Sequence, residues 1–181
     1  MNRKFVDKVA STTGLLFAVV LLVAGGLLTW GYSFANSQVK TQLQAQLITF
    51  PAAGSGSLKA LPQPDQGIVA KYAGEQLLTG RQAEVFADHY IAVHLKEIGG
   101  GKTYSQVSAQ SMANPSDTAL AGTVETLFKG ETLRGMLLNA YAFWQLGQIA
   151  MYSAIFTFIG GLLFLILALL GFSHARRVEE A

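Results

Sequence analysis

Two long stretches without Asp, Glu, Lys or Arg dominate the pattern of hydrophobic and polar positions along the chain. The first lies between Lys8 and Lys40, and the second begins after Arg134 and is also mostly apolar. Because a helix rises about 1.5 Å per residue, about 20 apolar residues cross the hydrocarbon core of a bilayer. The pattern therefore predicts transmembrane helices at residues 9–32 and 151–172.

The residues between the two predicted spans show mainly helical periodicity. Val39, Leu43 and Leu47 recur at a spacing of four, which predicts that the first span continues as an amphipathic helix. The prolines and glycines of residues 51–66 predict a loop. We therefore expect an all-α membrane protein, in which two transmembrane helices are joined by a mainly helical extracytoplasmic domain at residues 33–150.

Turn signals divide this domain further. Helices are expected at residues 68–78 and 81–98, and three consecutive glycines end the second of them. Asn114 followed by Pro115 predicts the start of another helix, with Asn114 as its N-cap. Residues 47–50 are the best candidate for a short strand.

The charges of the two tails predict the orientation of the spans. Residues 1–8 and 173–181 contain an excess of basic side chains, and short basic segments stay on the cytoplasmic side of a membrane. Both termini are therefore expected in the cytoplasm and the central domain outside. An alternative is a signal peptide cleaved near Ala35, but the first apolar stretch is longer than the usual 7 to 15 residues of such peptides.

Composition narrows the function classes. The chain is 51% hydrophobic and 13% charged, whereas soluble domains carry about 25% charged residues. This composition argues against an ordinary water-soluble enzyme. The absence of cysteine excludes disulfides and a lipid-anchored lipoprotein. The central region carries as many acidic as basic side chains, so it offers no basic stripe for nucleic acid.

The spans contain small residues at helical spacing, which allow close helix packing in lipid. The predicted packing seams are Gly14, Ala18, Gly25 and Thr29 in the first span, and Ala150, Ala154, Thr157 and Gly161 at the second. Aromatic rings are expected where the helices leave the hydrocarbon, at Trp30, Tyr32, Trp144 and Tyr152. The bilayer is thus one partner, and a membrane protein or a second copy is another.

Catalytic and ligand sites receive little support from the residues. The Gly-Lys-Thr at Lys102 resembles the end of a phosphate-binding loop, but Lys96 stands where that loop needs a glycine. A helix end and turn is the better interpretation, so no nucleotide is expected. His89 and His94 would point about 140° apart on a regular helix, which does not suit a shared metal ion. We therefore expect no catalytic, metal-binding or cofactor-binding residue.

The order of these elements resembles a group of uncharacterised actinobacterial two-span membrane proteins. The similarity is strongest at residues 94–104, HLKEIGGGKTY. The resemblance implies a multi-pass protein of the bacterial cytoplasmic membrane. Some members carry the label aromatic ring-opening dioxygenase, but non-haem iron needs about three convergent His and carboxylate ligands, which the residues here do not supply.

Three functions follow in order of support. The first is a non-enzymatic accessory or scaffolding subunit of a larger cell-envelope or respiratory membrane complex. The second is an extracytoplasmic sensor or binding module for a small apolar ligand, which predicts an apolar pocket between the outer helices. The third is a metal-dependent enzyme that uses His89 and His94.

Overall fold

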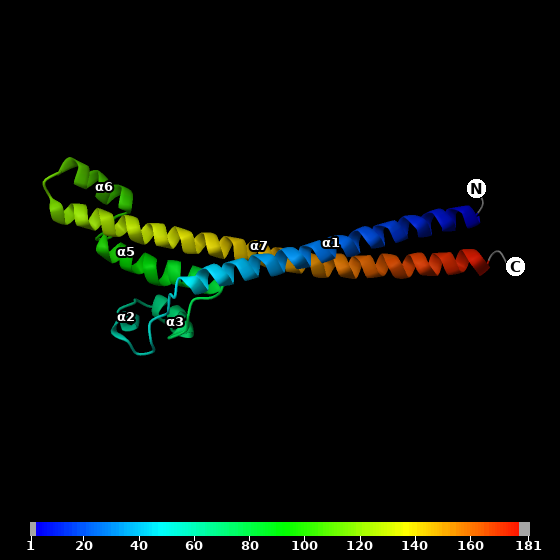
Figure 1. Ribbon diagram of the computed structural model, residues 1–181, viewed down its shortest axis with the longest axis horizontal. Coiled ribbons are helices and arrows are strands. Elements are labelled where there is room, and N and C mark those ends of the chain that lie inside the picture. The colour runs from blue at the N-terminus through cyan, green and yellow to red at the C-terminus, as the bar shows by residue number, and fades with distance from the viewer. Residues whose placement is uncertain (1–2, 178–181) are drawn as a thin grey trace. The chain divides into compact units, whose positions relative to one another are not determined.

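The computed structural model describes residues 3–177 and is helical almost throughout this range (Figure 1). Its elements are α1 (Arg3–Ala45), α2 (Gly56–Lys59), α3 (Asp65–Val69), the 3-10 helix η1 (Ala70–Tyr72), α4 (Gly80–Phe86), the π-helix η2 (Ala87–Ile91), α5 (Ala92–Ile98), α6 (Tyr104–Ala113) and α7 (Thr118–Arg177). Within the described range there is no β-strand. The prediction of a helical protein is confirmed.

Two helices, α1 and α7, are long and apolar enough to cross a membrane. They have 43 and 60 residues, and the qualifying regions are Phe5–Ala45 and Thr118–Arg177. Only 11% of the most apolar window of each helix is buried. A helix at the core of a soluble protein would be mostly buried, so this exposure is compatible with contact to lipid.

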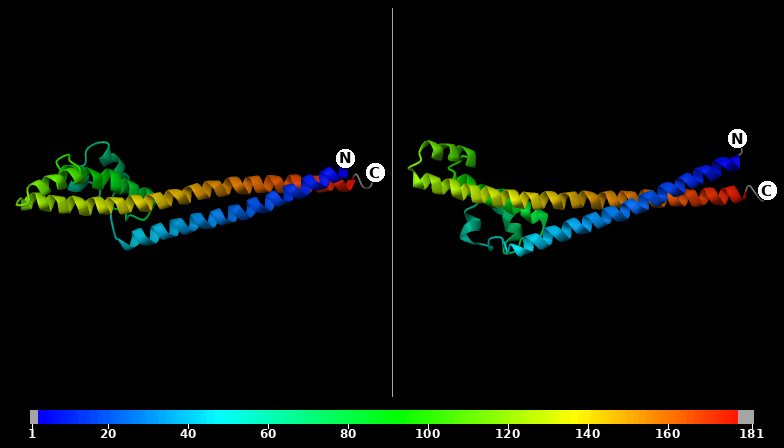
Figure 2. Two further views of the ribbon diagram at one scale, coloured as in Figure 1. Left: turned by 90° about the horizontal axis from the view of Figure 1, so that it is seen from above. Right: turned by 45° about the horizontal axis from the view of Figure 1, so that its top comes forward.

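The chain divides into two compact units, which we describe separately. Unit 1 comprises Met1–Ala35 and Leu146–Ala181, and unit 2 comprises Asn36–Gln145. In unit 1 the two long helices run side by side in opposite directions, so that the start of α1 lies beside the end of α7 (Figure 2). Unit 2 contains all the shorter helices.

The first helix ends earlier than its periodicity suggests. Val39 and Leu43 are buried as expected, but α1 stops at Ala45. Leu47 then adopts a positive φ of 54° and is 77% exposed, so its predicted place on the helix face is wrong. The chain turns here because the backbone of the following residues pairs with a distant segment.

That pairing replaces two predicted elements. Phe50 N–H donates to the Glu75 carbonyl at 2.9 Å, and Leu77 N–H donates to the Ile48 carbonyl at 2.9 Å. The predicted strand at 47–50 is therefore a single antiparallel bridge, between Thr49 and Gln76. The helix expected at 68–78 ends at Tyr72, because residues 75–77 take part in this bridge.

The start of α7 also differs from the prediction. Asn114 ends α6 instead of beginning the next helix, and its side-chain amide donates to the Gln110 carbonyl at 3.1 Å. Asp117 caps α7, since its carboxylate accepts from Leu120 N–H at 2.9 Å. The loop at 51–66 contains the short helix α2, and Leu58 and Leu61 anchor it in the core.

Candidate functional site

Small residues recur at every seventh position of the two helices in unit 1. The buried small residues are Ser11, Ala18 and Gly25 in α1, and Gly147, Ala154, Gly161, Ala168 and Ala175 in α7. A repeat of seven residues keeps one seam of each helix against its neighbour and imposes a left-handed supercoil. The close packing of unit 1 therefore depends on the absence of large side chains along this seam.

Three glycines show how close the two helices approach. A Cβ atom built on Gly14 would lie 3.6 Å from the Ala168 Cβ, which is ordinary contact. One built on Gly25 would lie 3.0 Å from the Phe158 ring, and one on Gly161 would lie 3.1 Å from the Leu22 Cγ. Side chains larger than hydrogen at the last two sites would force the partner to move.

The other predicted seam residues occupy different environments. Ala18 and Ala154 are buried at heptad positions, whereas Ala150 is half-buried and Thr29 is exposed. The Thr29 hydroxyl donates to the Gly25 carbonyl at 2.8 Å, which satisfies it within its own helix. The Thr157 hydroxyl does the same, donating to the Ser153 carbonyl at 3.0 Å.

The four predicted interface aromatics fall in both units. Trp30 and Tyr152 are exposed in unit 1, where Trp30 stacks on Phe34 with ring centroids 5.6 Å apart, and Tyr32 is half-buried. Trp144 lies in unit 2 and is half-buried. Its ring stacks near Tyr141, and the Arg81 guanidinium lies 5.8 Å from the Trp144 ring centroid.

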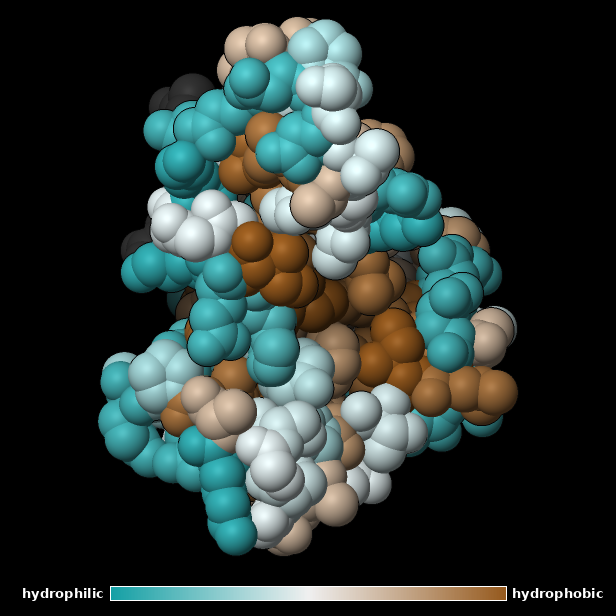
Figure 3. All heavy atoms as spheres, turned by 90° about the vertical axis from the view of Figure 1, so that its left-hand side faces the viewer, coloured by the Kyte–Doolittle hydropathy of each residue, from teal (hydrophilic) through white to brown (hydrophobic). Residues whose placement is uncertain are grey.

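Unit 2 has a core of large side chains, unlike unit 1. Phe50, Leu77 and Leu127 are almost fully buried. Phe50 packs edge-to-face against Phe86, with centroids 5.2 Å apart, and against Tyr72 at the same distance. The surface of this unit is mainly hydrophilic at the end that carries α6, around an apolar area in its middle (Figure 3).

Two glycines fix which face of α7 points into unit 2. A methyl group on Gly130 would overlap the Leu95 side chain of α5, and one on Gly80 of α4 would overlap Trp144. Gly130 therefore marks a close packing contact of a continuous helix, and not the bend that a glycine in this place suggests. These two contacts set the rotation of α7 about its own axis.

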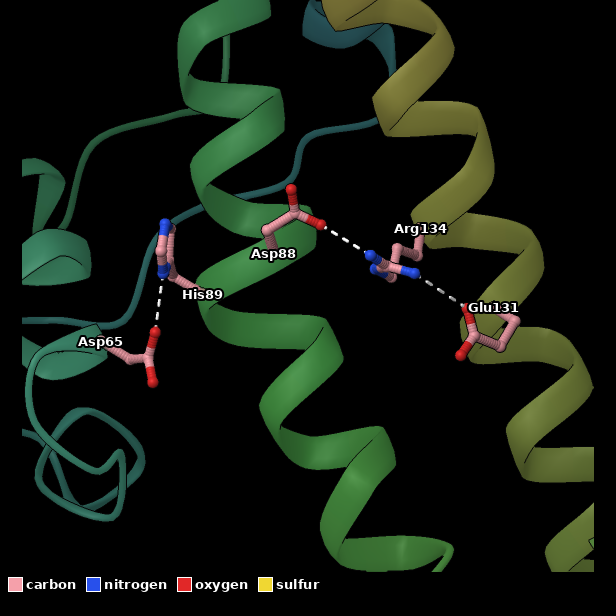
Figure 4. Close-up of polar contacts among 5 residues, drawn as sticks. All are labelled: Asp65, Asp88, His89, Glu131 and Arg134. Atoms are coloured by element: carbon pink, nitrogen blue, oxygen red, sulfur yellow. Dashed lines mark hydrogen bonds and ion pairs between the residues drawn. The ribbon is translucent and has the colours of Figure 1, made fainter. Parts of the chain in front are cut away.

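An ion-pair network fixes the same face (Figure 4). The Arg134 guanidinium of α7 donates to the Asp88 carboxylate of η2 at 2.8 Å and to Glu131 at 3.4 Å. The hydrogen bond to Asp88 raises the pKa of Arg134 above its ordinary value, so the arginine stays charged. The network links two elements that are more than 40 residues apart in the sequence.

The two central histidines serve separate contacts. His89 Nδ1 lies 2.7 Å from the Asp65 carboxylate, and His94 Nδ1 donates to the Tyr90 carbonyl at 2.8 Å. Among residues 3–177, no group of three or more His, Cys, Asp or Glu side chains could hold a metal ion. The His89 contact joins η2 to α3, which is a packing role (Figure 4).

The glycine-rich Gly-Lys-Thr segment forms the turn between α5 and α6. Gly99 is the C-cap of α5, and Gly100 and Gly101 adopt positive φ angles of 58° and 79°. The Thr103 side chain caps α6 by accepting from Gln106 N–H, and Lys102 donates to Gln110 at 3.0 Å. These contacts confirm the interpretation as a helix end and turn.

The opposite side of α7 in unit 2 carries exposed side chains, among them two large apolar ones. Thr132, Met136, Asn139 and Phe143 are all exposed, Met136 and Phe143 to 64% each. We call these four residues the outward face. Phe128 and Leu133 lie beside it and are also exposed. Sequence reasoning missed this face, because its spacing of three and four identifies a surface only when the buried side of α7 is known.

No family model, curated protein or solved structure matches the chain. Its own residues are therefore the basis for a function. Two surfaces of α7 differ most from those of an ordinary soluble helix: the small-residue seam in unit 1 and the outward face in unit 2.

Proposed function

We propose that the protein is a two-span membrane protein of the bacterial cytoplasmic membrane, with spans at residues 9–32 and 151–172. Its termini lie in the cytoplasm and residues 33–150 outside. The exposed Leu, Ile, Val and Phe side chains of unit 1 support membrane insertion, since a surface of that kind suits lipid. The basic residues Arg176 and Arg177 after the second span support the orientation.

We further propose that the protein acts without catalysis, as an accessory or scaffolding subunit of a larger membrane complex. The outward face of α7 is the observation that carries this proposal. Apolar side-chain area in contact with water, as at Met136 and Phe143, is unfavourable by about 25 cal/mol for each Å². Exposed methionine and phenylalanine on one helix face are therefore typical of a surface that another protein covers.

Lipid is a poor candidate to cover the Met136 end of this face. Met136 lies fifteen residues before Met151 on the continuous helix α7, which corresponds to about 22 Å at the helical rise. The polar headgroup layer on one side of a bilayer is only about 5 to 8 Å thick. On the proposed topology, Met136 is thus beyond the reach of the membrane.

The charged side chains of unit 2 favour a structural role over a chemical one. The ion pair between Asp88 and Arg134 joins η2 to α7, and the contact between Asp65 and His89 joins α3 to η2. Each of the two pairs joins neighbouring elements of unit 2, which is the contact that a structural role requires. Their geometry supports a rigid platform that presents the outward face.

Purification in a mild detergent, followed by mass measurement of the intact assembly, tests the proposal. We expect the assembly to contain a second membrane polypeptide, and we expect the Met136→Ser/Phe143→Ser double variant to form an assembly of lower mass, because its outward face no longer holds a protein partner. Thr126→Ser is the matched control, because Thr126 is exposed elsewhere on the helix. Recovery of nothing but copies of this chain from the native membrane would contradict the accessory-subunit role.

A further inference from the structure

We infer that the outward face of α7 pairs with the same face of a second copy of the chain, as a parallel two-helix contact. This inference rests on the proposal that protein covers the face, and it names the partner. Thr132, Met136, Asn139 and Phe143 follow one another at spacings of four, three and four residues. This alternation is the pattern by which one helix packs along another in a coiled coil.

The membrane orientation of the chain favours pairing of identical positions. Two copies that enter the membrane in the same direction have parallel α7 helices, and a two-fold axis between them brings equal residues together. Met136 then meets Met136 of the second copy, and Phe143 meets Phe143. The pairing is self-complementary and needs no other surface.

Asn139 supports a second copy over an unrelated helix. Its side chain is exposed between Met136 and Phe143 on the outward face, and within residues 3–177 it makes no side-chain hydrogen bond. An amide both donates and accepts, so two Asn139 side chains can satisfy each other across a two-fold axis. A single asparagine in such a seam is known to select the register and the number of paired helices.

The charge-free segment of α7 is compatible with a second copy. Residues 135–150 contain no Asp, Glu, Lys or Arg, so two copies have no like charges to oppose within this segment. Toward the start of α7 the same stripe continues into Lys129 and Glu125, which would meet their own equivalents in the second copy; the two are paired with each other at 2.6 Å, and the contact between copies is confined to residues 132–143. Thr132 is satisfied as well, since its hydroxyl donates to the Phe128 carbonyl at 2.7 Å.

The residues that flank the outward face allow two α7 helices to approach each other closely. A Cβ atom built on Gly135 would meet nothing within 4 Å, so the space beside the outward face is open. Ala142 flanks the seam further along and is also exposed. Small flanking residues let the backbones of two helices come near each other, which strengthens the contact between the larger seam residues.

Single-cysteine cross-linking in native membranes tests the pairing, because the natural chain contains no cysteine. The variants are Met136→Cys and Asn139→Cys. The control is Thr126→Cys, which lies about 110° around the helix from the outward face. Two differently tagged copies of the full chain are co-expressed and oxidised with copper phenanthroline. A disulfide needs Cα atoms within about 7 Å, so it reports facing positions.

The expected result is a disulfide between the two tagged copies at positions 136 and 139, at least about tenfold more abundant than at position 126. Equal cross-linking at all three positions, or no cross-linking at positions 136 and 139, overturns the pairing. A charge provides a second test. Asn139→Asp should reduce cross-linking at Met136→Cys by about tenfold, because two carboxylates would then face each other, and Asn139→Gln should reduce it less.

Failure of the pairing and failure of the proposed function are distinguishable by maleimide labelling of the same cysteines. Cysteines on the outward face that neither cross-link nor react with maleimide are covered by lipid or by a different protein, and a second polypeptide in the mass of the intact assembly identifies the protein. That result overturns the pairing and keeps the accessory role. Cysteines that do not cross-link but react freely overturn both.

Discussion

The two long helices pack by different means in the two units through which they run. In unit 1, α1 and α7 meet through glycine, alanine and serine at every seventh position, and their large side chains point outward. In unit 2, large side chains such as Phe50 and Leu77 are buried, and an ion pair joins α7 to η2. The same helix thus changes its packing chemistry along its length.

The difference corresponds to the solvent proposed for each unit. In lipid, burial of apolar side chains supplies no driving force between helices, so association depends on close van der Waals contact between backbones. In water, burial of large apolar groups is the main source of stability, and hydrogen bonds and ion pairs between the elements select one packing arrangement. The comparison therefore predicts that equivalent substitutions have different effects in the two units.

Removal of a large core residue in unit 2 should have the largest effect. Leu77 is fully buried, so Leu77→Ala should lower the free energy of unfolding of unit 2 by about 2–5 kcal/mol. Urea titration in detergent micelles, followed by Trp144 fluorescence in a Trp30→Phe background, measures this loss. Leu47→Ala, at a site 77% exposed, is the control. Equal effects of the two substitutions would contradict the assigned core.

Enlargement of a seam residue should be the next largest effect and should appear in unit 1. Gly25→Leu places a side chain against the Phe158 ring, and such overpacking costs about 1–3 kcal/mol. Gly26→Leu is a matched control, because nothing lies within 4 Å of its Cβ position. SDS titration in mixed micelles, followed by Trp30 fluorescence in a Trp144→Phe background, compares them. If Gly26→Leu lowered the stability of unit 1 as much as Gly25→Leu, the assigned packing seam would be wrong.

The ion pair of unit 2 should have an intermediate effect. Asp88→Ala removes the carboxylate 2.8 Å from Arg134, and we expect a loss of about 1–2 kcal/mol in the free energy of unfolding. Glu131→Ala removes the longer contact of 3.4 Å to the same guanidinium and should cost less. Urea titration with Trp144 fluorescence compares the variants. A larger loss for Glu131→Ala would reverse the assigned order.

The smallest effect is expected at the exposed pair near the start of α7. A hydrogen bond and the charge of Lys129 lower the pKa of Glu125 below its ordinary value. The pair therefore supports the helix above the unfolded-state pKa of the glutamate, and this support is lost as the pH falls through the folded-state pKa. Lys129→Ala should raise the pKa of Glu125, which NMR titration of its carboxyl carbon measures. An unchanged pKa would contradict the contact.

The long helices could be predicted from the sequence because a charge-free apolar stretch has few other structures available. The helix at 81–98 was predicted for a similar reason, since its apolar residues repeat at helical spacing. Its centre is the π-helix η2, however, which periodicity did not indicate. The wrong predictions at Leu47, at 68–78 and at Asn114 share one cause. In each case, a backbone or side-chain contact replaced the locally preferred structure.

The outward face could not be predicted, because its exposure depends on contacts between distant residues. Met136 and Phe143 occupy an apolar helix and, from the sequence, suit a buried position equally well. Gly80, Leu95 and Asp88 decide which side of α7 is buried, and each is at least 35 residues away from its contact on α7. Only the folded unit shows that the two apolar residues remain uncovered.

Cysteine labelling with a membrane-impermeant maleimide tests the central claim most directly, namely that α7 is embedded in lipid over one part and exposed to water outside the cell over another. Thr126, Phe156 and Ser173 are all exposed on this helix. We predict that Thr126→Cys is labelled in intact cells, that Ser173→Cys is labelled only after permeabilisation, and that Phe156→Cys is labelled in neither state. Labelling of Phe156→Cys as fast as Thr126→Cys, or of Thr126→Cys only after permeabilisation, would contradict the account.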